Sequence, residues 1–514
     1  MAAWIIIVGC VFHAVLWKST RWPTLLSIPL TLFVLLVWKV LLWPFVFSPL
    51  RRLPEPKGGH LLTGHTHLVP NERSGMPHDE WINEIPDVPL VRYRMRWNKE
   101  VVFVTSAPTL AEVLVQKNYE FSKPASLRRG LGRILGVGLI VAEGQEHKTQ
   151  RKLLMPAFSH RHVKNLYPVF WEQACRLVEV LEEETGKTGQ ATLDITDWLA
   201  RATLDILGVA GLGEAFDTLH HPDHEICTAY RGVFEQRRPA GRIALLLMMA
   251  RHVLSPVLPQ RDPISVATET LTGVARRLIA NKTRQTGASA SGGKDIISVA
   301  LSSGQFTDRM LENHLLTFLA AGHETTATTL TWAVYALCLY PKVQERLREE
   351  LRQSLPMQDS AVTAESLDTL PYLQAVCNEV LRVYPPAGLT RRIAVRDTLV
   401  QGQFIPAGTE LAIVLRATNL STRLWGADAR EFRPERWLKT PSGGGSTSNY
   451  AFMTFLHGPR SCIGQGFARG EFACLLAALV RAFTIELAED GPIVIETGLT
   501  SRPRGGLKVR LTHV

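Results

Sequence analysis

The ten residues FLHGPRSCIG at positions 455–464 decide the fold class of this chain. Their cysteine, Cys462, lies between two glycines and precedes an apolar stretch, residues 466–483, with helical spacing. Glycines let the backbone approach a flat ligand closely, and the free amides at a helix start stabilise a thiolate. With Arg460 two residues away, such a thiolate can bind a soft metal, haem iron included. Taken alone, the motif also fits a small buried cysteine, and this alternative stays open.

A second motif, AGHETT at residues 321–326, lies inside a periodic stretch that predicts a long helix over residues 309–340. It places an acid directly before a threonine, Glu324 and Thr325, which helix propensity does not explain. The structural alternative is a threonine that bonds back to the carbonyl one turn earlier and bends the helix.

Two further motifs space charged side chains one helical turn apart. Glu379 and Arg382 share a predicted helix face, and a surface ion pair of this kind is worth under about 1 kcal/mol. The segment FRPERW follows at residues 432–437. His147 and Arg151 are also one turn apart, and by themselves they fit a solvated helix face.

Together these motifs resemble the cytochrome P-450 superfamily over roughly residues 50–514. The first stretch fits that family's haem-binding signature, F-x-x-G-x-R-x-C-x-G, at every specified position, and the other motifs follow in the family's order. The resemblance implies that Cys462 is the axial thiolate ligand of a haem b iron. It implies haem contacts for the other signature residues: Arg460 as a propionate partner, Phe455 beside the sulfur, and Gly458 and Gly464 in the loop.

The resemblance also assigns the motif of the long helix. In the family, the acid and the threonine deliver protons during oxygen activation, roles that pass here to Glu324 and Thr325. Gly322, one turn before Thr325, would open a gap for oxygen. His323 matches a variable position and is expected to be structural.

Two more groups of side chains gain roles from the same resemblance. The expected structural triad, which holds a segment near the proximal haem face, consists of Glu379, Arg382 and Arg436. The expected propionate contacts, besides Arg460, are His147, Arg151 and Arg392. Many family members have tryptophan in place of His147.

The chain is predicted to be mainly α with a small β domain, which is the helical prism of this family. Apolar periodicity predicts helices at residues 163–184, 193–212, 264–283, 309–340, 342–355, 371–384 and 466–483. Short strands are predicted at residues 90–95, 100–105, 393–395, 410–414, 483–487 and 507–511. Without a repeat or a second linker, residues 60–514 are expected to form one haem-thiolate catalytic domain.

The first 47 residues are predicted to be a membrane anchor. Residues 1–17 carry no charged side chain, and residues 24–43 reach the roughly 20 apolar residues that span a bilayer. One span and a two-span hairpin both stay open. Residues 48–59 contain three prolines and are predicted to be a stiff linker. The basic residues that follow the second run place that end in the cytoplasm, which predicts an endoplasmic reticulum protein whose catalytic domain faces the cytoplasm.

The net charge of +10 does not indicate a nucleic-acid partner. The first 60 residues contain six basic side chains and one acid, so half of the excess lies around the predicted anchor. No block of five like charges occurs, and nucleic-acid binding is not expected. The seven cysteines form no CxxC or zinc spacing, which fits a reducing compartment.

The expected function is a haem-thiolate monooxygenase that inserts one oxygen atom from O2 into a lipophilic small molecule, of terpenoid or polyketide type. No flavin or nicotinamide module is recognisable, so electrons are expected from a separate NADPH-cytochrome reductase, with cytochrome b5 as a second candidate. Membrane lipid is the other expected partner. The apolar run at residues 243–250 fits a segment dipping into the bilayer and a core helix equally well.

Two alternatives to this function stay open. One is a haem-thiolate isomerase or dehydratase that uses no O2, against which the intact Glu324 and Thr325 argue. The other is a membrane-tethered haem sensor or redox protein.

Overall fold

The computed structural model describes residues 23–69, 76–85, 88–186, 189–234, 263–288, 295–302, 304–355, 362–440, 443–489 and 491–514. The predicted first span at residues 1–17 and the apolar run at residues 243–250 lie outside the described residues.

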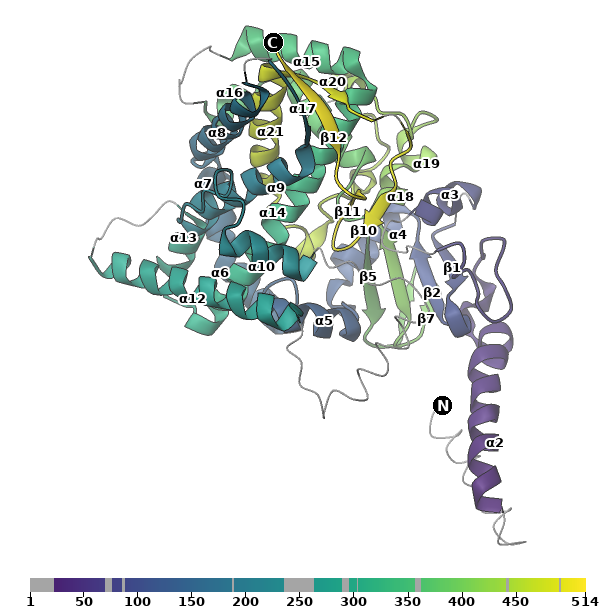
Figure 1. Cartoon of the computed structure of the whole chain (residues 1–514). Coiled ribbons are helices and arrows are strands. Elements are labelled where there is room, and N and C mark those ends of the chain that lie inside the picture. Colours follow the sequence, from purple (N-terminus) through teal and green to yellow (C-terminus); the bar gives the residue numbers. More distant parts are fainter. Residues whose placement is uncertain are drawn as a thin grey trace.

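The long helix α14 (Asp308–Leu339) runs through the body, with other helices packed around it (Figure 1). The Thr307 side chain caps its start by accepting from the Met310 N–H, and Pro341 begins the next helix. The helices flanking it include α8 (Tyr167–Thr185), α9 (Ile195–Ile206), α17 (Pro371–Val383) and α21 (Gln465–Ala482). Their facing apolar residues form the largest buried cluster of the described residues.

The other α-helices are shorter or more peripheral. They are α3 (Met76–Glu84), α4 (Ala107–Ala111), α5 (Ala125–Leu135), α6 (Gly144–Leu154), α7 (His160–Lys164), α10 (Glu225–Phe234), α12 (Pro263–Ala288), α13 (Ile296–Ser302), α15 (Pro341–Ser354), α16 (Ala364–Asp368), α18 (Leu415–Asn419), α19 (Thr422–Trp425) and α20 (Glu435–Lys439).

A five-stranded sheet lies beside the helical part, in the order β1-β2-β8-β5-β3 (Figure 1). Its strands are β1 (Leu90–Arg94), β2 (Glu100–Val104), β3 (Phe121–Ser122), β5 (Leu389–Ala394) and β8 (Glu410–Val414). Smaller sheets contain β4 (Gln190–Asp194), β12 (Lys508–His513) and β9 (Phe483–Leu487), then β6 (Thr398–Val400) with β7 (Gln403–Ile405), and β10 (Ile495–Thr497) with β11 (Ser501–Pro503). The prediction of a mainly helical chain with a small β part is confirmed.

Three predicted elements differ from the observed ones. The helix predicted at residues 163–184 is two helices, α7 and α8, because the chain turns between Lys164 and Tyr167. The helix predicted at residues 193–212 begins only at Ile195, because its first two residues belong to β4 and the Asp194 carboxylate caps α9 by accepting from the Thr196 N–H. The strand predicted at residues 393–395 is the end of the longer β5.

The N-terminal described helix projects from the body (Figure 1). It consists of α2 (Pro23–Val37) and a wider π-helical continuation, η1 (Trp38–Phe47). Within the described residues, the structure has one helix that is long enough and apolar enough to cross a membrane, Pro29–Phe47. The segment after it, predicted as a linker at residues 48–59, packs against the body: it forms the 3-10 turn η2 (Pro49–Arg52), in which Leu50 is buried.

Candidate active site

The loop before α21 places Cys462 at the start of that helix. Residues Gly458–Arg460 form the 3-10 turn η11, and the Cys462 N–H donates to the Phe455 carbonyl at 2.8 Å. Gly458 has a φ of 77°, and a Cβ there would lie 2.2 Å from the Leu114 carbonyl oxygen. Close packing against the protein itself therefore requires the glycine at position 458, whereas the motif predicts a close approach to a ligand.

Gly464 differs from Gly458 in this respect. Its φ is −86°, and the nearest atom to an added Cβ would be in the Phe158 ring at an ordinary contact distance of 3.8 Å. It is the N-cap residue of α21, and its N–H hydrogen bonds to the Cys462 sulfur.

The Cys462 side chain is exposed, although it lies in a densely packed part of the protein. Burial raises the pKa of the Cys462 thiol, while the Gly464 N–H and the Arg151 charge act in the opposite direction. The positive charge beside the sulfur thus belongs to Arg151 of α6, and not to Arg460 as the sequence spacing suggested. An accessible thiol with a hydrogen-bond donor and a cation beside it suits metal ligation.

Arg460 and Arg151 tie the cysteine loop to neighbouring segments. Arg460 Nη1 donates to the carbonyls of Asn118 and Phe121 at 2.6 and 2.7 Å, and Arg460 Nη2 pairs with Glu143. Arg151 donates to the Ser461 carbonyl at 2.6 Å and to the Ser461 hydroxyl at 3.2 Å.

His147 is buried, and the charges of four cations act on it. These four, Lys123, Arg151, Arg392 and Arg460, form the cation cluster. Burial, followed by the charges of these four residues, lowers the pKa of His147 to about 4. The ring is therefore neutral near pH 7, and its Nδ1 lies 3.2 Å from the Tyr119 hydroxyl.

The cluster also perturbs its own members. Burial, with the Arg460 charge second, lowers the pKa of Arg392 to about 10. Burial likewise lowers the pKa of Lys123 to about 8, against the opposing charge of Glu143. Among the described residues, Glu143 is the carboxylate that pairs with this cluster, through Arg460 and Lys123.

Four buried or half-buried cations facing one carboxylate leave a net positive charge beside the accessible thiol. A bound group with two carboxylates would neutralise that charge, and uncompensated buried charge is costly. Haem has two propionates, so the residues present fit haem. Of the predicted propionate contacts, His147, Arg151, Arg392 and Arg460 are brought together here. Lys123 was missed, because no motif of the sequence includes it.

In α14 the Thr325 hydroxyl donates to the Ala321 carbonyl at 2.8 Å, which is the back-bonded arrangement of the structural alternative. Gly322 does not face open space: an added Cβ would lie 3.1 Å from Leu207 of the π-helical turn η9 (Leu207–Leu212). Gly322 thus allows close packing of α14 against η9, and its expected role in making room for oxygen stays a prediction.

Glu324 is buried and both of its carboxylate oxygens accept hydrogen bonds from hydroxyls. The Tyr230 hydroxyl of α10 donates to Oε2 at 2.7 Å, and the Thr500 hydroxyl donates to Oε1 at 2.7 Å. Thr328, one turn further along α14, bonds to Thr500 at 3.1 Å. His323, as expected, is a buried structural residue, with its ring edge-on to Tyr230.

The predicted triad is assembled in the interior. Arg382 donates twice to Glu379 at 2.8 Å, and Arg436 donates to the same carboxylate at 3.0 Å. The Trp437 indole also donates to Glu379 at 2.9 Å. Arg382 further donates to the carbonyls of Asn419, Ala429 and Glu431. These bonds hold the segment before α20 against α17.

Comparison with known proteins decides the family. The family model of cytochrome P-450 matches residues 54–509. The chain belongs to the cytochrome P-450 family.

Named relatives agree with this result. The P-450 monooxygenase FUM15 of Gibberella moniliformis is 41% identical over 93% of this chain and 91% of its own length. ALT8 of Alternaria alternata is 40% identical over 92% of both chains, and sphH of Aspergillus fumigatus is 40% identical over 93% of this chain and 91% of its own length. This P-450 is accordingly an oxygenase, and the family implies a haem-thiolate iron cofactor.

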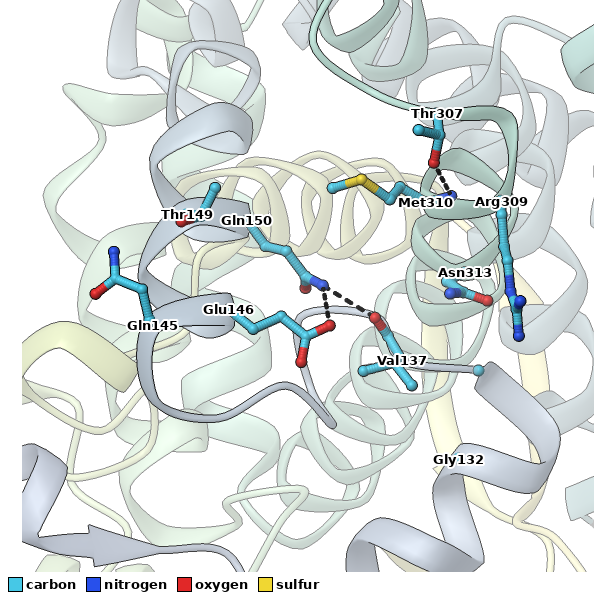
Figure 2. A pocket seen from close by; sticks show the side chains of 11 residues that line it. Gly132, Val137, Gln145, Glu146, Thr149, Gln150, Thr307, Arg309, Met310 and Asn313 are labelled. Atoms are coloured by element: carbon cyan, nitrogen blue, oxygen red, sulfur yellow. Dashed lines mark hydrogen bonds between the residues drawn. The ribbon is translucent and has the colours of Figure 1, made fainter.

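A separate pocket of about 640 Å³ lies between α6, the connection after α5 and the start of α14 (Figure 2). Gln150 projects into it and donates to the Val137 carbonyl at 3.0 Å. The residues that α6 contributes to it are Gln145, Glu146, Thr149 and Gln150, and not the His147 and Arg151 of the cation cluster. In this P-450, α6 therefore separates the cation cluster from the pocket.

Proposed function

We propose that this chain is an NADPH- and O2-dependent monooxygenase that oxidises a lipophilic small molecule of terpenoid or polyketide type. The single observation that carries the assignment is the accessible Cys462 thiol beside a net-positive cation cluster. The kinship with fungal P-450 monooxygenases, which act in secondary metabolism, supports the reaction class.

In this proposal Cys462 holds the haem iron, and Lys123, His147, Arg151, Arg392 and Arg460 hold the propionates. When bound, the haem supplies the redox chemistry of oxygen activation, which electron density from a thiolate favours. The Gly464 N–H and Arg151 stabilise the anionic sulfur. The protein contributes ligand, orientation and charge, and the cofactor contributes the reactivity.

Glu324 and Thr325 are proposed to hold and move the protons that the reaction consumes. The Glu324 carboxylate accepts from Tyr230 and Thr500, and the Thr325 hydroxyl donates to Ala321. Each group therefore has to exchange a present hydrogen bond before it passes a proton. A buried acid connected to a short chain of hydroxyls is suited to that task.

Electrons are proposed to come from a separate NADPH-cytochrome reductase, with cytochrome b5 as a second donor. The exposed Lys148, Lys152 and Arg433 are candidates for a basic docking patch. Charge reversal at these three positions should lower the reductase-supported rate most at low salt. Arg510→Glu, an exposed change on β12, is the control. A rate that is independent of salt in both variants would refute the patch.

The chain is proposed to sit in the endoplasmic reticulum membrane with its body in the cytoplasm. The apolar helix Pro29–Phe47 supports membrane anchoring. Arg51 and Arg52, exposed directly after it, support the orientation.

The function is tested by expressing the full chain with a reductase and measuring product from a terpenoid and polyketide panel. Oxygenated product that requires both NADPH and O2 is the expected result. Product formed under strict anaerobiosis without NADPH would instead establish the isomerase or dehydratase alternative. No NADPH consumption with any panel member would favour the haem sensor or redox protein.

A further inference from the structure

We propose that Arg92 and Asn98 of the β1–β2 hairpin clamp the end of the membrane helix, so that the body is held at one angle to the bilayer. In that position the exposed side chains of Leu61, Leu62 and Trp97 are seated in the lipid interface. This inference rests on the proposed membrane anchoring and is independent of the reaction.

The clamp acts where the helix is interrupted. Pro44 has no N–H, so it cannot donate to the Val40 carbonyl one α-helical turn earlier, and the helix is widened from Trp38 onward. Asn98 Nδ2 donates to that Val40 carbonyl at 2.8 Å. Arg92 Nη1 donates to the Pro44 carbonyl at 2.8 Å. Two side chains of the catalytic body thus bind the backbone of the membrane helix, where the Val40 side chain is buried.

Asn98 is fixed from both ends of its amide. Its Oδ1 accepts from Arg94 at 2.9 Å, while its Nδ2 also donates to the Leu61 carbonyl at 2.5 Å. The guanidinium of Arg94 lies 4.4 Å from the centre of the Phe45 ring, on the helix itself. The amide therefore has one orientation that satisfies all of its partners.

Arg92 and Arg94 are in turn fixed by Glu55, in the segment after the helix. Arg92 Nη2 and Arg94 Nε donate to its two oxygens at 2.7 and 2.6 Å. Burial raises the pKa of Glu55, but the bonds from Arg94 and Arg92 outweigh this, and the net pKa is lowered. The carboxylate is charged near pH 7 and bridges both arginines, so the clamp is a closed network and not a single contact.

The hairpin turn carries backbone strain at this point. Trp97 and Asn98 have φ values of 61° and 52°, in the left-handed region that bulky residues avoid. Such conformations persist where the surroundings hold them, and here they direct the Asn98 amide toward the helix.

The turn also exposes apolar side chains beside the helix. Leu61, Leu62 and Trp97 are 64, 49 and 53% exposed, and the Trp97 N–H donates to the Leu62 carbonyl at 3.0 Å, so they are neighbours. Their exposure in water would be unfavourable, and tryptophan prefers the membrane interface. Because Asn98 binds both Val40 and Leu61, this apolar surface is continuous with the anchor.

Basic side chains lie on the same segments. Arg51, Arg52, Lys57 and Arg96 are exposed. Cations beside an apolar interface surface suit anionic headgroups, at about 1 kcal/mol per residue near the bilayer. The occupant that fits this surface is therefore the lipid bilayer that holds the anchor.

The clamp is tested on the full-length holoenzyme in nanodiscs that contain anionic lipid. Genetically encoded spin labels replace Phe33 on the anchor and Leu399 on the body, both exposed. Pulsed electron resonance then measures the distribution of distances between them. We expect one narrow distribution in the parent protein and a width at least twofold larger in Asn98→Gly, which removes the amide but accepts the backbone conformation.

The matched control is Asp217→Gly, the same kind of change at another residue with positive φ, 53°, away from the anchor. It should leave the width unchanged. A broad distribution in the parent protein, or an unchanged width in Asn98→Gly, would overturn the clamp. Failure of the chain to enter nanodiscs at all would instead refute the proposed anchoring.

The lipid contact has its own readout. A spin label at Leu62 should be relaxed more by oxygen than by a water-soluble nickel complex, whereas a label at Lys342, exposed at the start of α15, should show the reverse. Equal nickel accessibility at both positions would overturn the seated surface. Neither measurement depends on turnover.

Discussion

At the residue scale, the two glycines that flank Cys462 have different requirements. Gly458→Ala would place a Cβ 2.2 Å from the Leu114 carbonyl at a φ of 77°. We expect this variant to lose most of its haem incorporation, measured as haem per protein. Gly464→Ala meets only an ordinary contact at 3.8 Å and should retain most of its haem. Equal loss in both variants would show that a ligand, and not Leu114, sets the glycine requirement.

The Tyr230 hydroxyl gives a second prediction at this scale. Tyr230→Phe removes one of the two hydroxyl donors to the buried Glu324 carboxylate, a bond to a charged group worth about 1.5–3 kcal/mol. We expect kcat to fall by about tenfold or more, with substrate affinity unchanged. Tyr335→Phe, on α14 like Glu324 but in a different cluster of aromatic rings, is the control. Unchanged kcat in Tyr230→Phe would exclude a role in positioning Glu324.

The sequence motifs predicted those contacts that join residues close together in the sequence. The pairing of Glu379 with Arg382 follows from two positions on one helix face. Lys123, Tyr230 and Thr500 were not predicted, because each lies far from the motif residue that it contacts and carries no pattern of its own. The charge beside Cys462 was assigned to Arg460 for the same reason: sequence distance is a poor guide across a loop.

At the element scale, the triad of Glu379, Arg382 and Arg436 holds the segment before α20 against α17. Glu379 and Arg382 are fully buried, and breaking one partner of a buried ion pair costs about 3–5 kcal/mol. Glu379→Gln should therefore lower the midpoint of urea unfolding strongly and release haem. Arg346→Ala, which removes an exposed ion pair to Glu435, should cost under about 1 kcal/mol. Similar costs for the two changes would contradict the structural role of the triad.

Long periodic elements were predictable and short ones were not. The stretch at residues 309–340 predicted α14 to within one residue, because its buried faces repeat at helical spacing. The strand β4 was not predicted, and its last two residues were assigned to the following helix, since none of its five residues is fully buried and a helical pattern follows directly. Tertiary pairing with β12 decides that segment.

At the scale of the whole molecule, buried histidines predict acid sensitivity. Burial lowers the pKa of His314 from 6.5 to about 4, and neither ring nitrogen has a partner among the described residues. Because the unfolded chain binds the proton more readily, the neutral His314 contributes to the free energy of unfolding. This contribution is complete above pH 6.5 and is lost as the pH falls toward 4. Full protonation of His314 lowers the free energy of unfolding by about 3 kcal/mol.

We therefore expect the free energy of unfolding to fall between pH 6.5 and 4.5, with a shallower slope in His314→Phe. The measurement is urea unfolding at several pH values. His221→Phe, at an exposed position, should keep the parent slope. If the free energy of unfolding of His314→Phe fell with pH as steeply as that of the parent protein, other groups would dominate the acid response.

The net charge of +10 is distributed over three tasks across the molecule. Part of it forms the cation cluster that fits two haem propionates. Part surrounds the anchor, where Arg92 and Arg94 bind the helix and Glu55. The remainder includes the exposed basic residues proposed to meet a reductase and lipid headgroups.

The central claim is that Cys462 is the thiolate ligand of a bound haem. The most direct test is the difference spectrum of the reduced, CO-bound full-length protein, parent against Cys462→Ala. The matched change is Cys377→Ala, at a buried cysteine on α17. We predict the red-shifted thiolate band in the parent protein and in Cys377→Ala, and its complete loss in Cys462→Ala. A thiolate band retained by Cys462→Ala would contradict the account.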